Sequence, residues 1–119
     1  MLRLRFVPSL VVTVAGLGLL VACGQNSLGD PTGSTCPSNS TLTYDNFGKA
    51  FFATNCNSCH GKTQSPAFDT PEQIQANASE IDRAAASGPS ATNTYMPDDG
   101  DVSDADRKKL GEWLACGAH

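Results

Sequence analysis

The chain has 119 residues, of which twelve are acidic and eight are basic, so its formal net charge is −4. This length accommodates one small domain, and the acidic balance argues against nucleic acid as a partner. Five cysteines in so short a chain point to disulfides or to covalent attachment of another group.

Residues 1–22 have the pattern of a secretory signal peptide. Arg3 and Arg5 form a short basic region, and a mostly apolar run follows. The run is too short for a membrane span, which needs about 20 consecutive apolar residues. Residues 20–23, Leu-Val-Ala-Cys, resemble the lipobox of bacterial lipoproteins.

The lipobox resemblance implies that Cys23 becomes the lipidated N-terminus of the mature protein. Several acyl chains on one residue give stable anchoring. We therefore expect an exported protein, lipid-anchored to a bacterial membrane and facing the periplasm or the cell exterior. The alternative is an ordinary signal peptide that leaves Cys23 as a spare thiol.

Residues 23–41 are expected to form a lipidated flexible tether, and residues 42–119 the folded domain. The tether is rich in Gly, Ser, Asn, Asp, Thr and Pro and has almost no apolar residues, so it cannot bury a core. Six basic and twelve acidic residues remain after the signal peptide. Membrane attachment would therefore depend on the lipid rather than on basic patches.

A first helix is predicted to begin at Thr43 or Asp45 and to end near Thr54. Gly48 lies inside it, where glycine costs about 1 kcal/mol relative to alanine. A glycine in this position usually allows another group to approach closely. Aromatic residues spaced three or four apart give the helix one buried face. These residues are Tyr44, Phe47, Phe51 and Phe52.

The segment after this helix is Cys56-Asn57-Ser58-Cys59-His60. This spacing is typical of covalent haem c attachment, in which two thiols form thioethers with the porphyrin and the adjacent imidazole binds the iron. One alternative is half of a zinc site, but a second spaced ligand pair is missing. The other is a redox dithiol, which usually occurs in a βαβ context that is not predicted here.

If one cysteine carries lipid and two carry haem, Cys36 and Cys116 are left, and in an exported protein they are candidates for a disulfide. The bond would close nearly the whole domain into a ring and contribute on the order of 4 kcal/mol in the chain-entropy model. The alternative is two inert or partner-directed thiols.

Gly48, Phe52 and the haem-attachment motif together resemble the N-terminal helix of monohaem class I cytochromes c. In that family the glycine and the aromatic residue pack on a C-terminal helix that carries an aromatic residue and leucines. The resemblance covers about residues 42–116. It implies a small all-α, cytochrome c-like bundle of three to five helices around one covalently attached haem c.

The resemblance also assigns a role to Pro66, in the loop after the motif. In the family, a proline of this loop offers its carbonyl oxygen to the other ring nitrogen of the proximal histidine, here His60. Such a contact would orient the imidazole ring and raise its basicity. The alternative is a plain turn proline.

A second helical stretch is predicted to begin at Thr70, with Pro71 in the first helical position and Gln73 completing a capping box. It is expected to continue to Gly88, where Gly-Pro gives a strong stop. A break within residues 76–79 would divide it into two short helices.

Met96 is the only methionine after the signal peptide, and it precedes Pro97. The resemblance matches Met96 to the distal haem ligand of the family. A thioether favours ferrous iron, so His/Met ligation raises the reduction potential. Tyr95 and His119 are the alternative ligands.

A final helix is predicted after Ser103, its N-cap. Leu110, Trp113 and Leu114 would form its buried stripe and pack on the glycine and the aromatic residue of the first helix. An acidic turn precedes this helix, close to the proposed distal ligand. It would attract a basic redox partner, unless it is only a solvated loop.

These features predict a membrane-tethered c-type cytochrome, not an enzyme, that shuttles single electrons between redox protein partners outside the cytoplasm. One alternative is a haem-based sensor or a peroxidase-like protein with a labile sixth ligand. Another is a dedicated electron-transfer subunit of a larger oxidoreductase. The sequence leaves the donor, the acceptor and the choice of inner or outer membrane open.

Overall fold

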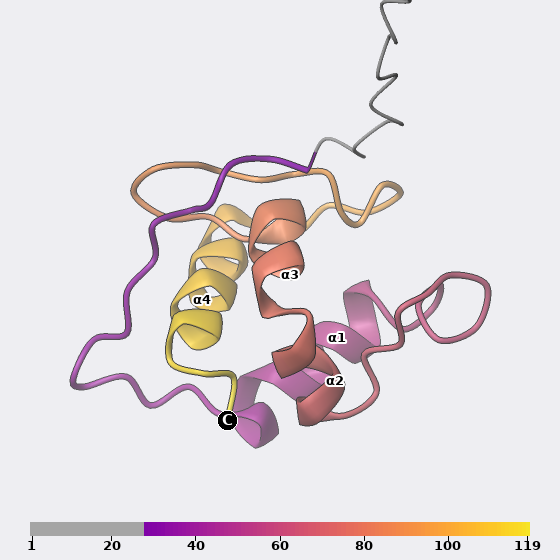
Figure 1. The fold of residues 1–119 in the computed structure, drawn as a ribbon, viewed down its shortest axis with the longest axis horizontal. Helices are drawn as coiled ribbons and strands as arrows, with labels where there is room; N and C mark the ends of the chain where they lie inside the picture. Colours follow the sequence, from indigo (N-terminus) through magenta and orange to yellow (C-terminus); the bar gives the residue numbers. More distant parts are fainter. Residues whose placement is uncertain (1–27) are drawn as a thin grey trace, which may run out of the picture.

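The computed structural model describes residues 28–119, and this part of the chain is helical (Figure 1). Its elements are the π-helical turn η1 (Tyr44–Gly48) and the helices α1 (Lys49–Asn55), α2 (Pro71–Ala76), α3 (Ala78–Ala85) and α4 (Asp104–Ala115). No strand forms within the described range, and the only β-type pairings there are isolated bridges. The all-α prediction is confirmed.

The predicted signal peptide, the lipobox and Cys23 lie outside the described residues. None of the helices in residues 28–119 is long and apolar enough to cross a membrane.

The first helix begins at the predicted cap. The Thr43 hydroxyl accepts from the Asn46 backbone N–H at 3.2 Å, and the Asn46 side chain accepts from the Thr43 N–H at 2.8 Å. This reciprocal capping box satisfies two backbone donors that a helix N-terminus otherwise leaves unpaired. η1 runs directly into α1, so the helix delivers the chain to Cys56.

α1 packs against α4 through aromatic side chains, as predicted. The rings of Phe52 and Trp113 are 6.2 Å apart, and both side chains are buried. Phe47 adds an edge-on contact with the same indole at 6.0 Å. Leu110 and Leu114 complete the predicted buried stripe of α4. The helix before the haem-attachment motif is therefore fixed on the C-terminal helix.

α2 and α3 also begin and divide as predicted. Thr70 caps α2 in a capping box with Gln73, and Pro71 occupies the first helical position. The break falls at Asn77, which ends α2 and precedes α3. These local signals were sufficient because each cap is made by side chains within one turn.

α3 ends at Ala85, earlier than the predicted stop at Gly88. Ala86 is extended, and the N–H of Ser87 donates to the carbonyl oxygen of Arg107 on α4 at 3.0 Å instead of continuing the helix. A tertiary hydrogen bond to α4 therefore replaces the last turn expected from the sequence.

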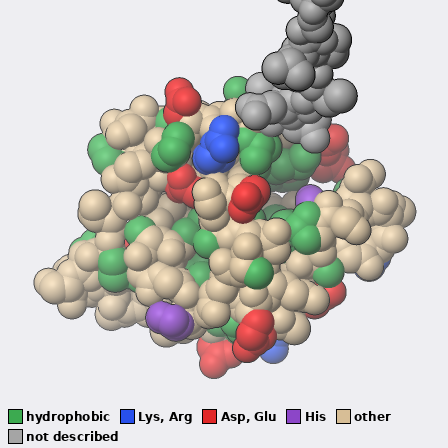
Figure 2. Space-filling model, in the orientation of Figure 1, with side chains coloured by type: hydrophobic (Ala, Val, Ile, Leu, Met, Phe, Trp, Pro, Cys, Tyr) green, Lys and Arg blue, Asp and Glu red, His purple; other side chains and the backbone are tan. Residues whose placement is uncertain are grey.

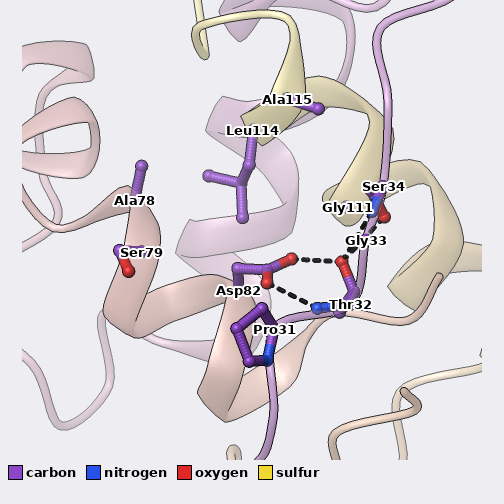
Figure 3. A pocket seen from close by; sticks show the side chains of 10 residues that line it. All are labelled: Pro31, Thr32, Gly33, Ser34, Ala78, Ser79, Asp82, Gly111, Leu114 and Ala115. Carbon is purple, nitrogen blue, oxygen red and sulfur yellow. Dashed lines mark hydrogen bonds between the residues drawn. The ribbon is translucent and has the colours of Figure 1, made fainter. Parts of the chain in front are cut away.

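The predicted flexible tether is wrong for its described part, residues 28–41, which lie against the domain. Thr32 is fully buried, and its N–H and hydroxyl donate to the Asp82 carboxylate of α3 at 2.9 and 2.5 Å (Figure 3). Gly29 donates to the Arg83 carbonyl oxygen and accepts from Arg83 Nε, both at 2.8 Å. The segment is held by polar contacts of small residues. Its lack of apolar residues therefore led to the wrong prediction of a flexible tether.

A disulfide between Cys36 and Cys116 ties this segment to the end of α4, with their Cα atoms 4.7 Å apart. Figure 1 shows the segment running around the outside of α4 before it enters η1. The two cysteines are 80 residues apart in the sequence, so the crosslink encloses nearly the whole domain.

Candidate functional site

A cavity of about 560 Å³ lies beside the Cys-x-x-Cys-His segment. Its volume is within the range of about 300–1,000 Å³ that is usual for small-molecule and cofactor sites. Four of the residues singled out in the sequence for ligand chemistry line it, together with the loop proline. They are Cys56, Cys59, His60, Met96 and Pro66.

The rest of the lining combines buried apolar residues with exposed acidic ones. Phe52, Phe68 and Ile81 line the interior, and the small side chains of Ala84 and Ala85 allow a flat group to approach closely. Carboxylates also line the cavity, from Glu80, Asp98 and Asp99.

In the view of Figure 2, acidic side chains appear at several places and basic side chains are few. This agrees with the acidic balance of the sequence.

Both thiols of the motif are free and reach the cavity. The Cys56 N–H donates to the Phe52 carbonyl oxygen at 2.9 Å, and the His60 N–H donates to the Cys56 carbonyl oxygen at 3.0 Å. These bonds continue the turn of α1 through the motif. Burial raises the pKa of the Cys56 thiol to about 12, which is the response of a thiol in apolar surroundings.

The His60 ring is held by two contacts. Its Nδ1 lies 2.9 Å from the Pro66 carbonyl oxygen, the contact that was expected from the resemblance. Because a carbonyl oxygen can only accept, Nδ1 carries the proton in this pair, and Nε2 keeps a lone pair for a metal. The Phe68 ring lies against the imidazole with centroids 4.6 Å apart.

Met96 approaches the same cavity from the loop after α3. Its N–H donates to the Ala84 carbonyl oxygen at 3.0 Å, and its carbonyl oxygen accepts from Arg107 Nη1 at 2.9 Å. The side chain is 40% exposed. Neither alternative ligand, Tyr95 or His119, is among the residues that line the cavity.

Phe68, which packs on His60, and Arg107, which does not line the cavity but donates to the Met96 backbone, were not indicated by the sequence. Arg107 opens an Arg-Lys-Lys run that reads as an exposed basic cluster, yet only 5% of its surface is exposed. Its burial could have been predicted from helical spacing. Arg107 precedes Leu110 by three positions and Leu114 by seven, which places it on the buried face of the helix.

A second cavity, of about 330 Å³, lies between the N-terminal segment, α3 and α4 (Figure 3). Its main polar group, the Asp82 carboxylate, already accepts two hydrogen bonds from Thr32. None of the residues proposed for haem binding lines it.

The donor set in the larger cavity fits a covalently attached haem. Two free thiols, an imidazole with an available Nε2 and a thioether contributed by a separate loop are the groups that haem c uses. Within residues 28–119, no group of three or more His, Cys, Asp and Glu side chains is arranged to hold a metal ion. The zinc alternative therefore lacks ligands in the described part of the chain, and the absence of strands there removes the βαβ context of a redox dithiol.

A family of known proteins matches the chain. The family model described as "Cytochrome C oxidase, cbb3-type, subunit III" matches residues 46–114, more than half of the chain. The matched range includes the Cys56 to His60 motif, Met96 and Arg107. Searches of curated proteins and of solved structures return no match.

Proposed function

The chain belongs to the family of cbb3-type cytochrome c oxidase subunit III, a cytochrome c domain family, and we propose that it is a single-electron carrier with His60 and Met96 as the two axial haem ligands. Membership of this family implies electron transfer by one covalently attached haem c. Cys56 and Cys59 are the residues that would form the thioethers.

The observation that carries the proposal is the composition of one cavity. The motif after α1 contributes two thiols and an imidazole, and the loop after α3 contributes a thioether. Bound haem supplies reversible one-electron chemistry at its iron. His60 and Met96 would both hold the iron, which would leave no position for a substrate.

The residues around the ligands favour fast and repeatable electron exchange. The Pro66 carbonyl and the Phe68 ring fix the orientation of His60. Apolar side chains such as Phe52 and Ile81 line the cavity and would shield one part of a bound haem from water. A neutral thioether from Met96 stabilises ferrous iron relative to ferric iron and raises the potential.

Carbon monoxide binding tests this proposal against a sensor or a peroxidase-like protein. With both axial positions filled, the reduced protein at neutral pH should bind carbon monoxide slowly or not at all. Rapid binding would show an open or labile sixth position and would favour the alternative class.

We also propose that lipid on Cys23 holds the domain close to a membrane outside the cytoplasm. Gly29 is hydrogen-bonded to Arg83, and Cys23 lies six residues before this contact in the sequence. Six residues of fully extended chain span about 22 Å at most. Mass spectrometry of the purified protein tests this claim, since an unmodified Cys23 or an intact signal peptide would contradict it.

A dedicated subunit of a larger membrane oxidoreductase is the second candidate function. The family description, which names an oxidase subunit, favours it. Mild detergent extraction followed by affinity purification distinguishes the two, because a subunit co-purifies with its complex in fixed proportion and a free carrier does not.

A further inference from the structure

Arg107 is a buried cation whose contacts converge on the distal side of the haem cavity. Its Nη1 lies 2.8 Å from the carbonyl oxygen of Ala85, 2.9 Å from that of Asn93 and 2.9 Å from that of Met96. One nitrogen with two N–H groups thus serves three acceptors, so at least one N–H is shared between two of them.

Carbonyl oxygens, not a carboxylate, satisfy this guanidinium. Neither of the two salt bridges within residues 28–119 involves Arg107. Burial lowers its pKa, which Asp101 and Asp104 partly counteract, and an arginine side chain still stays protonated. A buried cation is costly to leave unpaired, so the three carbonyls and the arginine hold one another in place.

The three acceptors define the course of the distal loop. Ala85 is the last residue of α3, Asn93 is buried in the middle of the loop, and Met96 is the proposed ligand. The Met96 N–H is also bonded to the Ala84 carbonyl oxygen. Both backbone polar groups of Met96 are therefore fixed, one by α3 and the other by α4.

α4 connects both sides of the cavity. Through Trp113 it packs on Phe52 of α1, the helix that leads directly into the Cys-x-x-Cys-His motif. Through Arg107 it holds the loop that carries Met96. A single helix thus sets the separation between the segments that bear His60 and Met96.

We propose that Arg107 is a positioning residue that keeps Met96 on the haem iron by holding the distal loop against α4. The inference rests on the proposed His60/Met96 ligation. Without the guanidinium, the loop loses its hydrogen bonds to α4 at Asn93 and Met96, and Met96 dissociates more readily although its own side chain is unchanged.

The test compares Arg107→Met with the wild-type holoprotein. Oxidised wild type should show the weak red-region absorption band of methionine bound to iron, and Arg107→Met should lose much of it. Since a hydrogen bond to a charged group contributes about tenfold or more to an equilibrium, carbon monoxide binding to the reduced variant should be faster by roughly that factor. Far-UV circular dichroism and haem content should stay at wild-type levels.

Three further variants sharpen the test. Lys108→Met is the matched control, because Lys108 is the next residue of α4 but is exposed and paired with Asp104 at 2.8 Å; it should behave as wild type. Arg107→Lys keeps a cation that can donate to carbonyls and should restore part of the band. If Arg107→Met does not retain haem, Arg107→Gln replaces it in the test. This variant should also show a weaker red-region band and faster carbon monoxide binding than the wild type.

The outcomes separate this inference from the proposed function. A wild-type band that persists in a haem-loaded Arg107→Met or Arg107→Gln variant, with carbon monoxide binding unchanged, overturns the role of Arg107. Equal effects of Lys108→Met and Arg107→Met also overturn it, since they would indicate a general loss of positive charge. Absence of the band from the wild type refutes Met96 ligation itself and removes the basis of the inference.

Discussion

Gly48 and Trp113 are in direct contact, and a Cβ atom on Gly48 would overlap the indole ring. The glycine lies in η1, and the tryptophan, near the C-terminal end of α4, is fully buried. The absence of a side chain at one position therefore sets how closely the first and last helices approach.

Gly48→Ala should destabilise the protein, although alanine is the better helix former. Helix propensity would favour the variant by about 1 kcal/mol, whereas overpacking a core contact typically costs about 1–3 kcal/mol. Because both Trp113 and the backbone around it are fixed, we expect a net loss of stability. Denaturant unfolding of the holoprotein measures it. Lys49→Ala, an exposed change one residue away, is the control, and an equal or higher midpoint for Gly48→Ala would refute the steric argument.

The crosslink between Cys36 and Cys116 should contribute substantially to stability. A closed loop with a sequence separation of 80 residues corresponds to on the order of 4 kcal/mol in the chain-entropy model. Replacing both cysteines by serine should therefore lower the free energy of unfolding by an amount of that order. Assaying free thiols in the denatured, unreduced holoprotein gives an independent check. Two reactive thiols there would show that the bond does not form.

The contact between Thr32 and Asp82 should hold the N-terminal segment on the domain. Thr32→Val preserves the shape of the side chain but removes the hydroxyl that donates to Asp82, and so leaves a carboxylate oxygen without its buried partner. We expect faster proteolysis within residues 28–35 and little change in the haem spectrum. Ser40→Ala is the control. It also removes one side-chain hydrogen bond of the N-terminal segment, the bond to Glu112, but at a position outside residues 28–35. If Thr32→Val is cleaved at the wild-type rate, the other contacts are sufficient to hold the N-terminal segment on the domain.

The features that the sequence predicted well are local. Thr43 and Thr70 cap their helices through side chains three residues away, and the haem-attachment motif lies within a single turn. The buried stripe of α4 repeats with helical period. In each case the residues that decide the structure are neighbours in the chain, so the pattern carries the information.

The features that the sequence did not predict depend on partners far away in the chain. Thr32 is buried because Asp82 accepts from it, and α3 ends early because Ser87 donates to the backbone of α4. Arg107 is buried because three carbonyl oxygens, one from the end of α3 and two from the distal loop, accept from it. Composition describes each of these residues as polar and therefore exposed, and only the fold supplies the groups that satisfy them.

The absorption spectrum of the purified, oxidised protein, measured beside Met96→Ala, tests the central claim most directly. Both proteins should retain covalently bound haem, since the thioethers are formed by Cys56 and Cys59. The expected result is a weak red-region band in the wild type that is absent from Met96→Ala, together with a lower reduction potential of the variant. A wild type without the band, or a variant that keeps it, would contradict His60/Met96 ligation.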